Sequence, residues 1–265
     1  MDWREVSGNW ILVPDDPIAM VHFLGGAFVG AAPHVAYRLL LEALADQGYA
    51  IVATPFINTF DHRAIAQEVL ISFEQGLTYL RKRGLMQGYF PIYGLGHSMG
   101  CKLHLLINSL YSVERAGNVL MAFNNYSARR SIPLLEQVSQ VMDFTPPLFA
   151  NTMKMEFTPS PEETLAIVRD RYDVRRNLLI KFRKDDIDQT RPLSEVLVPL
   201  FPELTTVKIL QGTHTTPLAQ EIPWQAGESF SPLDAVGQFV KQTVNRDLNP
   251  LRDAILRWLD PLGAF

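Results

Sequence analysis

The segment Gly96-His97-Ser98-Met99-Gly100 constrains this chain more than any other part of its sequence. It fits the pattern G-x-S-x-G, and its flanks predict a buried strand over Tyr89–Leu95 and a helix over Cys101–Tyr111. In a strand–turn–helix setting this pattern is typical of a nucleophile elbow, whereas alone it also arises as a coincidental glycine-rich turn. We therefore expect Ser98 in a strained backbone position, between glycines that avoid collisions with the neighbouring strand and helix.

The composition is that of an ordinary folded protein and excludes several functions. The chain has 265 residues, 47% hydrophobic and 20% charged, enough for one large α/β domain or two small ones. A net charge of −4 gives no electrostatic basis for binding nucleic acid. Cys101 is the only cysteine, so no internal disulfide can form, and we expect neither a metal site nor a cofactor. With no signal peptide and no transmembrane segment recognised, the expectation is a soluble, cytoplasmic protein.

Short apolar segments alternate with longer amphipathic ones along most of the chain. This alternation is typical of a mostly parallel sheet with helices on both faces. It predicts further strands at Asn9–Val13, Ile18–Leu24, Tyr49–Thr54, Asn118–Phe123, Asn177–Phe182 and Thr206–Leu210. It predicts helices at His34–Gln47, Asp61–Arg83 (with Asp61 as N-cap), Pro232–Asp247 and Leu251–Leu259.

Residues 124–176 break this alternation. They carry five prolines and predict two helices, Ile132–Met142 and Pro161–Tyr172, the second capped by Ser160. We interpret the region as a helical insertion after a sheet strand. Its Phe and Met residues suit apolar acyl groups, and its Arg and Lys residues suit an acidic head group or a lipid phosphate. The alternative is a small helical subdomain with its own core and solvated arginines.

A serine nucleophile needs a base and an acid that orients the base. His214 is the candidate base, because it lies in a glycine-containing loop after the last predicted strand, where ligands collect in parallel sheets. Asp185 and Asp186 are the candidate acids, since both follow the strand Asn177–Phe182; we rank Asp185 first, Asp186 second and Asp188 third. The alternatives are a loop histidine bonded to backbone and a solvated acidic turn.

The oxyanion that forms during attack by a serine needs two backbone N–H donors. One should be that of Met99, the residue after the nucleophile. The other should come from the loop Gly25–Gly30, where we expect Ala27, with Phe28 or Gly26 as alternatives.

The same loop and the elbow also supply candidate substrate contacts. Gly25 and Gly26 would permit a close approach of backbone to substrate, and His97 would line the floor of the pocket. The loop lacks the spacing G-x-G-x-x-G, a Walker lysine and a ribose-binding acid, so we expect no dinucleotide site.

Ser98, then Asp185 or Asp186, then His214 is the chain order of the α/β-hydrolase superfamily, which the sequence resembles over nearly its whole length. Two strings, Val21-His-Phe-Leu-Gly-Gly-Ala-Phe-Val-Gly-Ala-Ala-Pro33 and Ala53-Thr-Pro-Phe-Ile-Asn-Thr-Phe-Asp-His62, resemble more narrowly a domain-of-unknown-function family of cyanobacteria and plant chloroplasts. The resemblance implies an α/β-hydrolase fold with residues 1–265 as a single domain and 124–176 as its lid. It implies no substrate, and the loop carries Gly25-Gly26 where the superfamily usually has His-Gly.

The leading functional hypothesis is a serine hydrolase that cleaves an apolar carboxylic ester or thioester through an acyl-enzyme. An acyltransferase with the same triad, and a non-catalytic fold relative that binds an apolar ligand or an assembly partner, are the alternatives. The expected partner is a small-molecule or lipid-like ester, with no nucleic acid and with room for peripheral contact with a membrane. The sequence leaves the oligomeric state open.

Overall fold

One sheet is the framework on which the rest of the chain is arranged. The structure, a computed structural model, describes residues 1–86, 88–128, 156–218 and 248–260. Within these ranges eight strands form a sheet in the order β1-β2-β4-β3-β5-β6-β7-β8. They are β1 (Arg4–Val6), β2 (Asn9–Leu12), β3 (Ala19–Leu24), β4 (Tyr49–Ala53), β5 (Ile92–His97), β6 (Gly117–Met121), β7 (Asn177–Phe182) and β8 (Thr205–Leu210). Neighbours from β4 to β8 are parallel, and β1 and β2 add an antiparallel edge.

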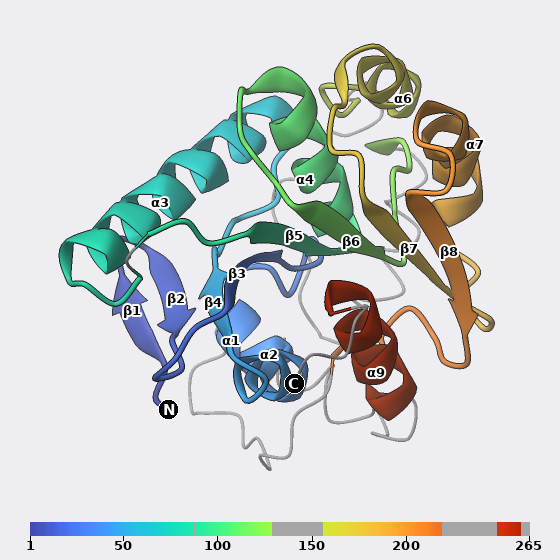
Figure 1. Ribbon diagram of the computed structural model, residues 1–265. Helices are drawn as coiled ribbons and strands as arrows, with labels where there is room; N and C mark the ends of the chain where they lie inside the picture. The colour runs from blue at the N-terminus through green and yellow to red at the C-terminus, as the bar shows by residue number, and fades with distance from the viewer. Residues whose placement is uncertain (87, 129–155, 219–247, 261–265) are drawn as a thin grey trace, which may run out of the picture.

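Helices cover both faces of this sheet (Figure 1). One face carries α1 (Pro33–Ala36), α2 (Arg38–Ala45) and α9 (Leu248–Leu259), and the other carries α3 (His62–Lys82), α4 (Met99–Leu110), α6 (Pro161–Arg171) and α7 (Thr190–Leu200). Every residue of β3, β4 and β6 is buried, because helices shield these parallel strands on both sides. The predicted α/β class with a mostly parallel sheet is confirmed.

Two helix starts predicted from the sequence are also confirmed. The Asp61 carboxylate accepts hydrogen bonds of 3.0 and 2.9 Å from the backbone N–H groups of Arg63 and Ala64 at the start of α3. Ser160 and Glu163 each accept a hydrogen bond from the other's backbone N–H at the start of α6. These bonds satisfy N–H groups that have no acceptor within their own helix.

The predicted helix His34–Gln47 is interrupted, because Tyr37 separates α1 from α2. Tyr37 has φ −116° and ψ 19°, outside helical geometry. Its side chain is fully buried, and its hydroxyl is hydrogen bonded to both Gly26 and His97. Contacts with distant parts of the chain thus outweigh the helical pattern at this one residue.

The remaining differences concern boundaries and elements that the pattern did not indicate. The strand predicted over Tyr89–Leu95 is observed as β5, which begins and ends later. Neither β1 nor α7 was predicted. The helices predicted over Ile132–Met142 and Pro232–Asp247 lie outside the described residues. No helix within the described ranges is both long and apolar enough to cross a bilayer.

The carboxyl ends of β3, β5, β7 and β8 lead into loops at one edge of the sheet. Leu24 at the end of β3 pairs with Gly96 of β5, and Phe182 at the end of β7 pairs with Leu210 of β8. The chain leaving β3 therefore passes beside the turn after β5, and the loops after β7 and β8 are neighbours. This is the edge at which parallel α/β sheets bind ligands.

Candidate active site

Ser98 occupies the tight turn between β5 and α4. Its backbone has φ 55° and ψ −117°, on the positive-φ side that non-glycine residues rarely adopt. Its N–H donates a hydrogen bond of 2.9 Å to the carbonyl of Met121, which ties the turn to the end of β6. The strained backbone expected at Ser98 is confirmed.

The two glycines of the elbow are needed for packing. A Cβ atom on Gly96 would lie 2.7 Å from the backbone nitrogen of Cys101, inside α4. A Cβ atom on Gly100 would overlap the carbonyl oxygen of Leu24, at the end of β3. Because both neighbours are backbone atoms, they cannot move aside as a flexible side chain would. The turn therefore admits only glycine at these positions without a shift of the surrounding backbone.

The loop after β8 brings His214 onto Ser98. The Nε2 atom of His214 lies 2.9 Å from Ser98 Oγ. The loop is held from within by a bond of 2.9 Å from the Thr213 N–H to Thr216 Oγ1 and one of 3.0 Å from the Thr216 N–H to the Thr213 carbonyl. It is held from outside by His97, whose Nε2 donates to the His214 carbonyl at 2.8 Å.

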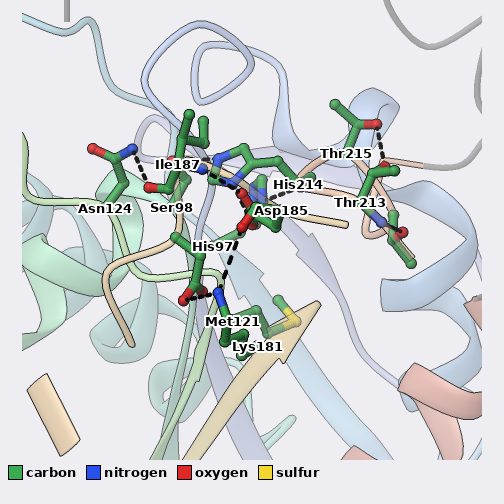
Figure 2. A network of polar contacts seen from close by, with 12 residues as sticks. His97, Ser98, Met121, Asn124, Lys181, Asp185, Ile187, Thr213, His214 and Thr215 are labelled. Atoms are coloured by element: carbon green, nitrogen blue, oxygen red, sulfur yellow. Dashed lines mark hydrogen bonds and ion pairs between the residues drawn. The ribbon is translucent and has the colours of Figure 1, made fainter. Parts of the chain in front are cut away.

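Asp185 completes a chain of hydrogen bonds with His214 and Ser98 (Figure 2). Its Oδ2 lies 2.8 Å from His214 Nδ1, and its Oδ1 accepts a bond of 3.1 Å from the N–H of Ile187. The Asp185 side chain is fully buried, whereas that of His214 is 20% exposed. Because a carboxylate only accepts, Nδ1 carries the imidazole proton, which leaves Nε2 to accept from the Ser98 hydroxyl.

The other two candidate acids lie elsewhere. Asp186 is exposed and makes no hydrogen bond or ion pair with any described residue, so the structure brings Asp185 and not Asp186 to His214. Asp188 pairs with Lys181 at 3.0 Å and accepts bonds from the N–H and the hydroxyl of Thr190. Asp188 therefore anchors the start of α7.

The predicted oxyanion donors fall into two groups. The N–H groups of Met99, Ala27 and Phe28 donate no hydrogen bond to any acceptor in the described part of the chain. The N–H of Gly26 donates to the Tyr37 hydroxyl at 2.8 Å, which takes Gly26 out of the set of free donors. A Cβ atom on Gly26 would lie only 3.5 Å from the Cβ of Ser98, so this loop passes directly beside the turn.

Both ring nitrogens of His97, which the sequence predicts to line the floor of the pocket, are hydrogen bonded within the protein. Its Nδ1 lies 2.7 Å from the Tyr37 hydroxyl, and its Nε2 donates to the His214 carbonyl. The residue is only 2% exposed, and its burial holds the pKa of the ring well below the ordinary value for histidine. Tyr37 is the contact that sequence reasoning missed, because nothing in the pattern of a surface helix marks one tyrosine as a site residue.

The remaining histidines contact other groups. His22 is hydrogen bonded to Thr54, and His62 stacks on Phe157. Among the described residues no cluster of three or more His, Cys, Asp or Glu side chains is arranged to hold a metal ion. The groups gathered at Ser98 are a hydroxyl, an imidazole and a carboxylate, which together suit nucleophilic and acid–base chemistry.

Solved structures with this arrangement of strands and helices include several hydrolases. The Pyrococcus furiosus esterase Pf2001 matches with a TM-score of 0.60 at 13% identity, over 96% of this chain and 85% of that one. The α/β hydrolase GrgF from Penicillium sp. sh18 matches with 0.56 at 14% identity, over 97% and 94%. A thioesterase domain from the curacin biosynthetic pathway matches with 0.51 at 12% identity, over 82% and 94%. At such low identities the likeness establishes the fold, which is that of the α/β-hydrolases.

No curated protein matches the sequence. A family model described as "Protein of unknown function (DUF1350)" matches residues 2–261. The matched range spans nearly the whole chain and includes Ser98, Asp185 and His214. The chain therefore belongs to the DUF1350 family.

Proposed function

We propose that this protein is a serine hydrolase that cleaves a carboxylic ester or a thioester through an acyl-enzyme on Ser98. One observation carries the proposal: Ser98 Oγ, His214 and Asp185 form an unbroken chain of hydrogen bonds of 2.9 and 2.8 Å. Because the imidazole proton is on Nδ1, facing Asp185, the Nε2 atom of His214 has a free lone pair directed at the serine hydroxyl. That is the ground-state geometry required of a general base.

Acylation begins when Ser98 Oγ attacks the carbonyl carbon of the substrate and its proton moves to His214 Nε2. The buried Asp185 carboxylate stabilises the imidazolium that results. The carbonyl oxygen becomes an oxyanion, which accepts hydrogen bonds from the backbone N–H groups of Met99 and Ala27. The imidazolium then donates its proton to the departing alkoxide or thiolate, which leaves as an alcohol or a thiol.

Deacylation repeats the same steps with water as the nucleophile. His214 Nε2 removes a proton from the water as its oxygen attacks the acyl carbon, and the same N–H groups hold the second oxyanion. The proton then returns to Ser98 Oγ as the acid product leaves. Both half-reactions thus use one base and leave the site as it began.

The substrate class rests on chemistry and on analogy. One protonated imidazole can donate the proton that the alkoxide of an ester or the thiolate of a thioester needs to leave. The neighbours described as an esterase and a thioesterase act on these bonds. The preference for apolar acyl groups depends on the interpretation of residues 124–176 as a lid. Much of that region lies outside the described residues, so the lid stays a prediction.

Labelling with a fluorophosphonate probe, followed by peptide mass spectrometry, tests the proposal directly. We expect the wild-type protein to be modified at Ser98, and Ser98→Ala and His214→Ala to remain unlabelled. The same three proteins are then assayed with short-chain esters and an acyl thioester, and circular dichroism verifies that each is folded. An acyltransferase would instead show slow hydrolysis that accelerates when an alcohol or thiol is added. A folded wild-type protein that neither labels nor turns over any ester would contradict the proposal and favour a binding protein.

A further inference from the structure

Two buried side chains connect the loop after β3 with the loop after β8. The N–H of Gly26 donates to the Tyr37 hydroxyl at 2.8 Å, and that hydroxyl lies 2.7 Å from His97 Nδ1. His97 Nε2 lies 2.8 Å from the carbonyl oxygen of His214. Tyr37 is fully buried and His97 is nearly so, and neither is hydrogen bonded to Ser98. The three hydrogen bonds therefore form a bridge from the predicted oxyanion loop, Gly25–Gly30, to His214, the predicted base. This bridge does not pass through Ser98.

Only one arrangement of protons satisfies all three bonds. A backbone N–H can only donate, so the Tyr37 oxygen accepts at the Gly26 end. A carbonyl can only accept, so the proton of His97 is on Nε2 and its Nδ1 is an acceptor for the Tyr37 O–H. Burial keeps both groups neutral, because it raises the pKa of Tyr37 and lowers that of His97. Every hydrogen bond of the bridge is thus donated in the same direction, from the Gly26 N–H toward the His214 carbonyl.

At the Gly26 end the bridge holds the loop through the N–H of Gly26, and a second hydrogen bond, to the carbonyl of the same residue, orients the neighbouring amide. The Gly26 carbonyl accepts a bond of 2.7 Å from the N–H of Gly30, which fixes the peptide plane between Gly26 and Ala27. In a trans peptide the C=O and N–H point in opposite directions, so the Ala27 N–H is fixed as well and points away from Gly30. A Cβ atom on Gly25 would lie 2.9 Å from the Tyr37 ring, which shows how closely the loop is packed on this tyrosine.

At the other end the bridge adds a third point of attachment for His214. The two nitrogens of its ring are bonded to Ser98 and Asp185, and its backbone carbonyl is bonded to His97. The rings of His97 and His214 also lie close, with centroids 5.0 Å apart. A displacement of the His214 backbone away from Ser98 would therefore break this part-buried hydrogen bond as well as the hydrogen bonds of its ring.

We propose that Tyr37 and His97 are positioning residues, which hold the Ala27 amide and the His214 imidazole at a fixed separation on the two sides of Ser98. This inference rests on the proposed hydrolase activity and specifies which residues set its geometry. Misplacing a catalytic group by about 1 Å costs about 100-fold in rate, and groups that act mainly in the transition state affect kcat more than KM. A defect confined to kcat is therefore the signature of such a role.

The test uses the full-length protein and variants at both positions. We expect Tyr37→Phe to lower kcat for a short-chain ester by about 10- to 100-fold and to change KM by no more than about twofold. His97→Leu should act similarly, and combining the two should cost little more than the worse single change, because both break one bridge. His97→Gln should retain much of the wild-type kcat. The oxygen and nitrogen of a glutamine amide are attached to one carbon, as Nδ1 and Nε2 of a histidine ring are. The amide oxygen can therefore accept from the Tyr37 hydroxyl while the NH₂ group donates to the His214 carbonyl.

Tyr172→Phe is the matched control. Its hydroxyl is also buried, accepts a bond of 2.7 Å from Asn118 and donates one of 2.6 Å to Asn177. Losing that hydroxyl should lower the free energy of unfolding about as much as in Tyr37→Phe and leave kcat unchanged. Equal loss of kcat in the control, or a folded Tyr37→Phe with wild-type kcat, would overturn the positioning role. If Tyr37→Phe does not fold, the kcat of His97→Leu is compared with that of His97→Gln. Equal kcat values in these two variants would overturn the positioning role.

Different results would contradict the proposed hydrolase activity and the positioning role of Tyr37 and His97. A wild-type protein that is inert to fluorophosphonate and esters would overturn the proposed hydrolase and this inference together. An active wild type whose Tyr37 and His97 variants keep their kcat would overturn the positioning role alone and leave the hydrolase standing.

Discussion

Asp185→Asn should nearly abolish turnover, because an asparagine cannot accept both hydrogen bonds that the Asp185 carboxylate accepts. Oδ1 of Asp185 accepts from the N–H of Ile187, and Oδ2 accepts from His214 Nδ1 (Figure 2). An amide has one accepting oxygen. The backbone N–H of Ile187 cannot change, whereas the imidazole can change its tautomer. The amide oxygen therefore turns to Ile187, its NH₂ faces His214, and the ring proton moves to Nε2, where it blocks acceptance of the Ser98 proton.

The expected size of the loss follows from this change of tautomer. Fixing the imidazole in the wrong tautomer lowers kcat by about 10⁴-fold in a Ser-His-Asp triad, which equals about 5.4 kcal/mol of transition-state stabilisation. The assay compares kcat and KM for one activated ester in wild type, Asp185→Asn and Asp186→Asn. Asp186 is one residue away and exposed, so its asparagine variant should retain full activity.

A folded Asp185→Asn protein that keeps more than about a tenth of the wild-type kcat would refute the reasoning on the tautomer. So would an equal loss in Asp186→Asn, since that would give the role of the acid to the exposed neighbour. Thermal unfolding of both variants separates a chemical defect from a loss of the fold.

Three further predictions concern stability. Burial lowers the pKa of Lys102 from 10.5 to about 7, so between these two pH values the lysine is protonated in the unfolded chain and neutral in the folded protein. The free energy of unfolding of the wild type therefore falls as pH is lowered from about 10.5 to about 7. Lys102→Met removes the titrating group and should flatten this pH dependence. Urea unfolding at several pH values measures this, and an unchanged slope would contradict it. Gly96→Ala should lower the free energy of unfolding by about 1–3 kcal/mol through its contact with Cys101, and an unshifted urea midpoint would count against that packing argument. Asp61→Ala should cost about 1 kcal/mol through loss of the helix cap, seen as a lower Tm; an unaltered Tm would mean the cap contributes nothing.

The sequence predicted those parts of the site that depend on local pattern. The strand–turn–helix around Ser98 and the position of His214 after β8 follow from hydrophobic periodicity and from the order of elements. Asp185 and Asp186 could be ranked but not separated, because adjacent residues differ only in the direction of their side chains. That direction depends on the turn after β7, in which Asp185 accepts the N–H of Ile187.

Features that depend on contacts between distant residues could not be predicted. Tyr37 lies 60 residues from His97 in sequence, and its place in an amphipathic segment favours continuous helix. The helix α7 was missed for a related reason. Its proline at 199 argues against a helix, yet Leu193, Val196 and Leu197 are buried in a cluster beside α4 and α6 that stabilises it.

The long separations within the site have a consequence for folding kinetics. Ser98 and His214 are 116 residues apart, and their meeting requires β5, β6, β7 and β8 to be paired in register. Contacts between residues so far apart in sequence form late in folding. Closing the long loop between them reduces the conformational entropy of the chain before the contacts themselves can stabilise the fold. During refolding from denaturant, helix content should return before the nucleophile regains its reactivity. The time course of Ser98 labelling would therefore record the docking of β8, the last of the described strands in chain order, against β7.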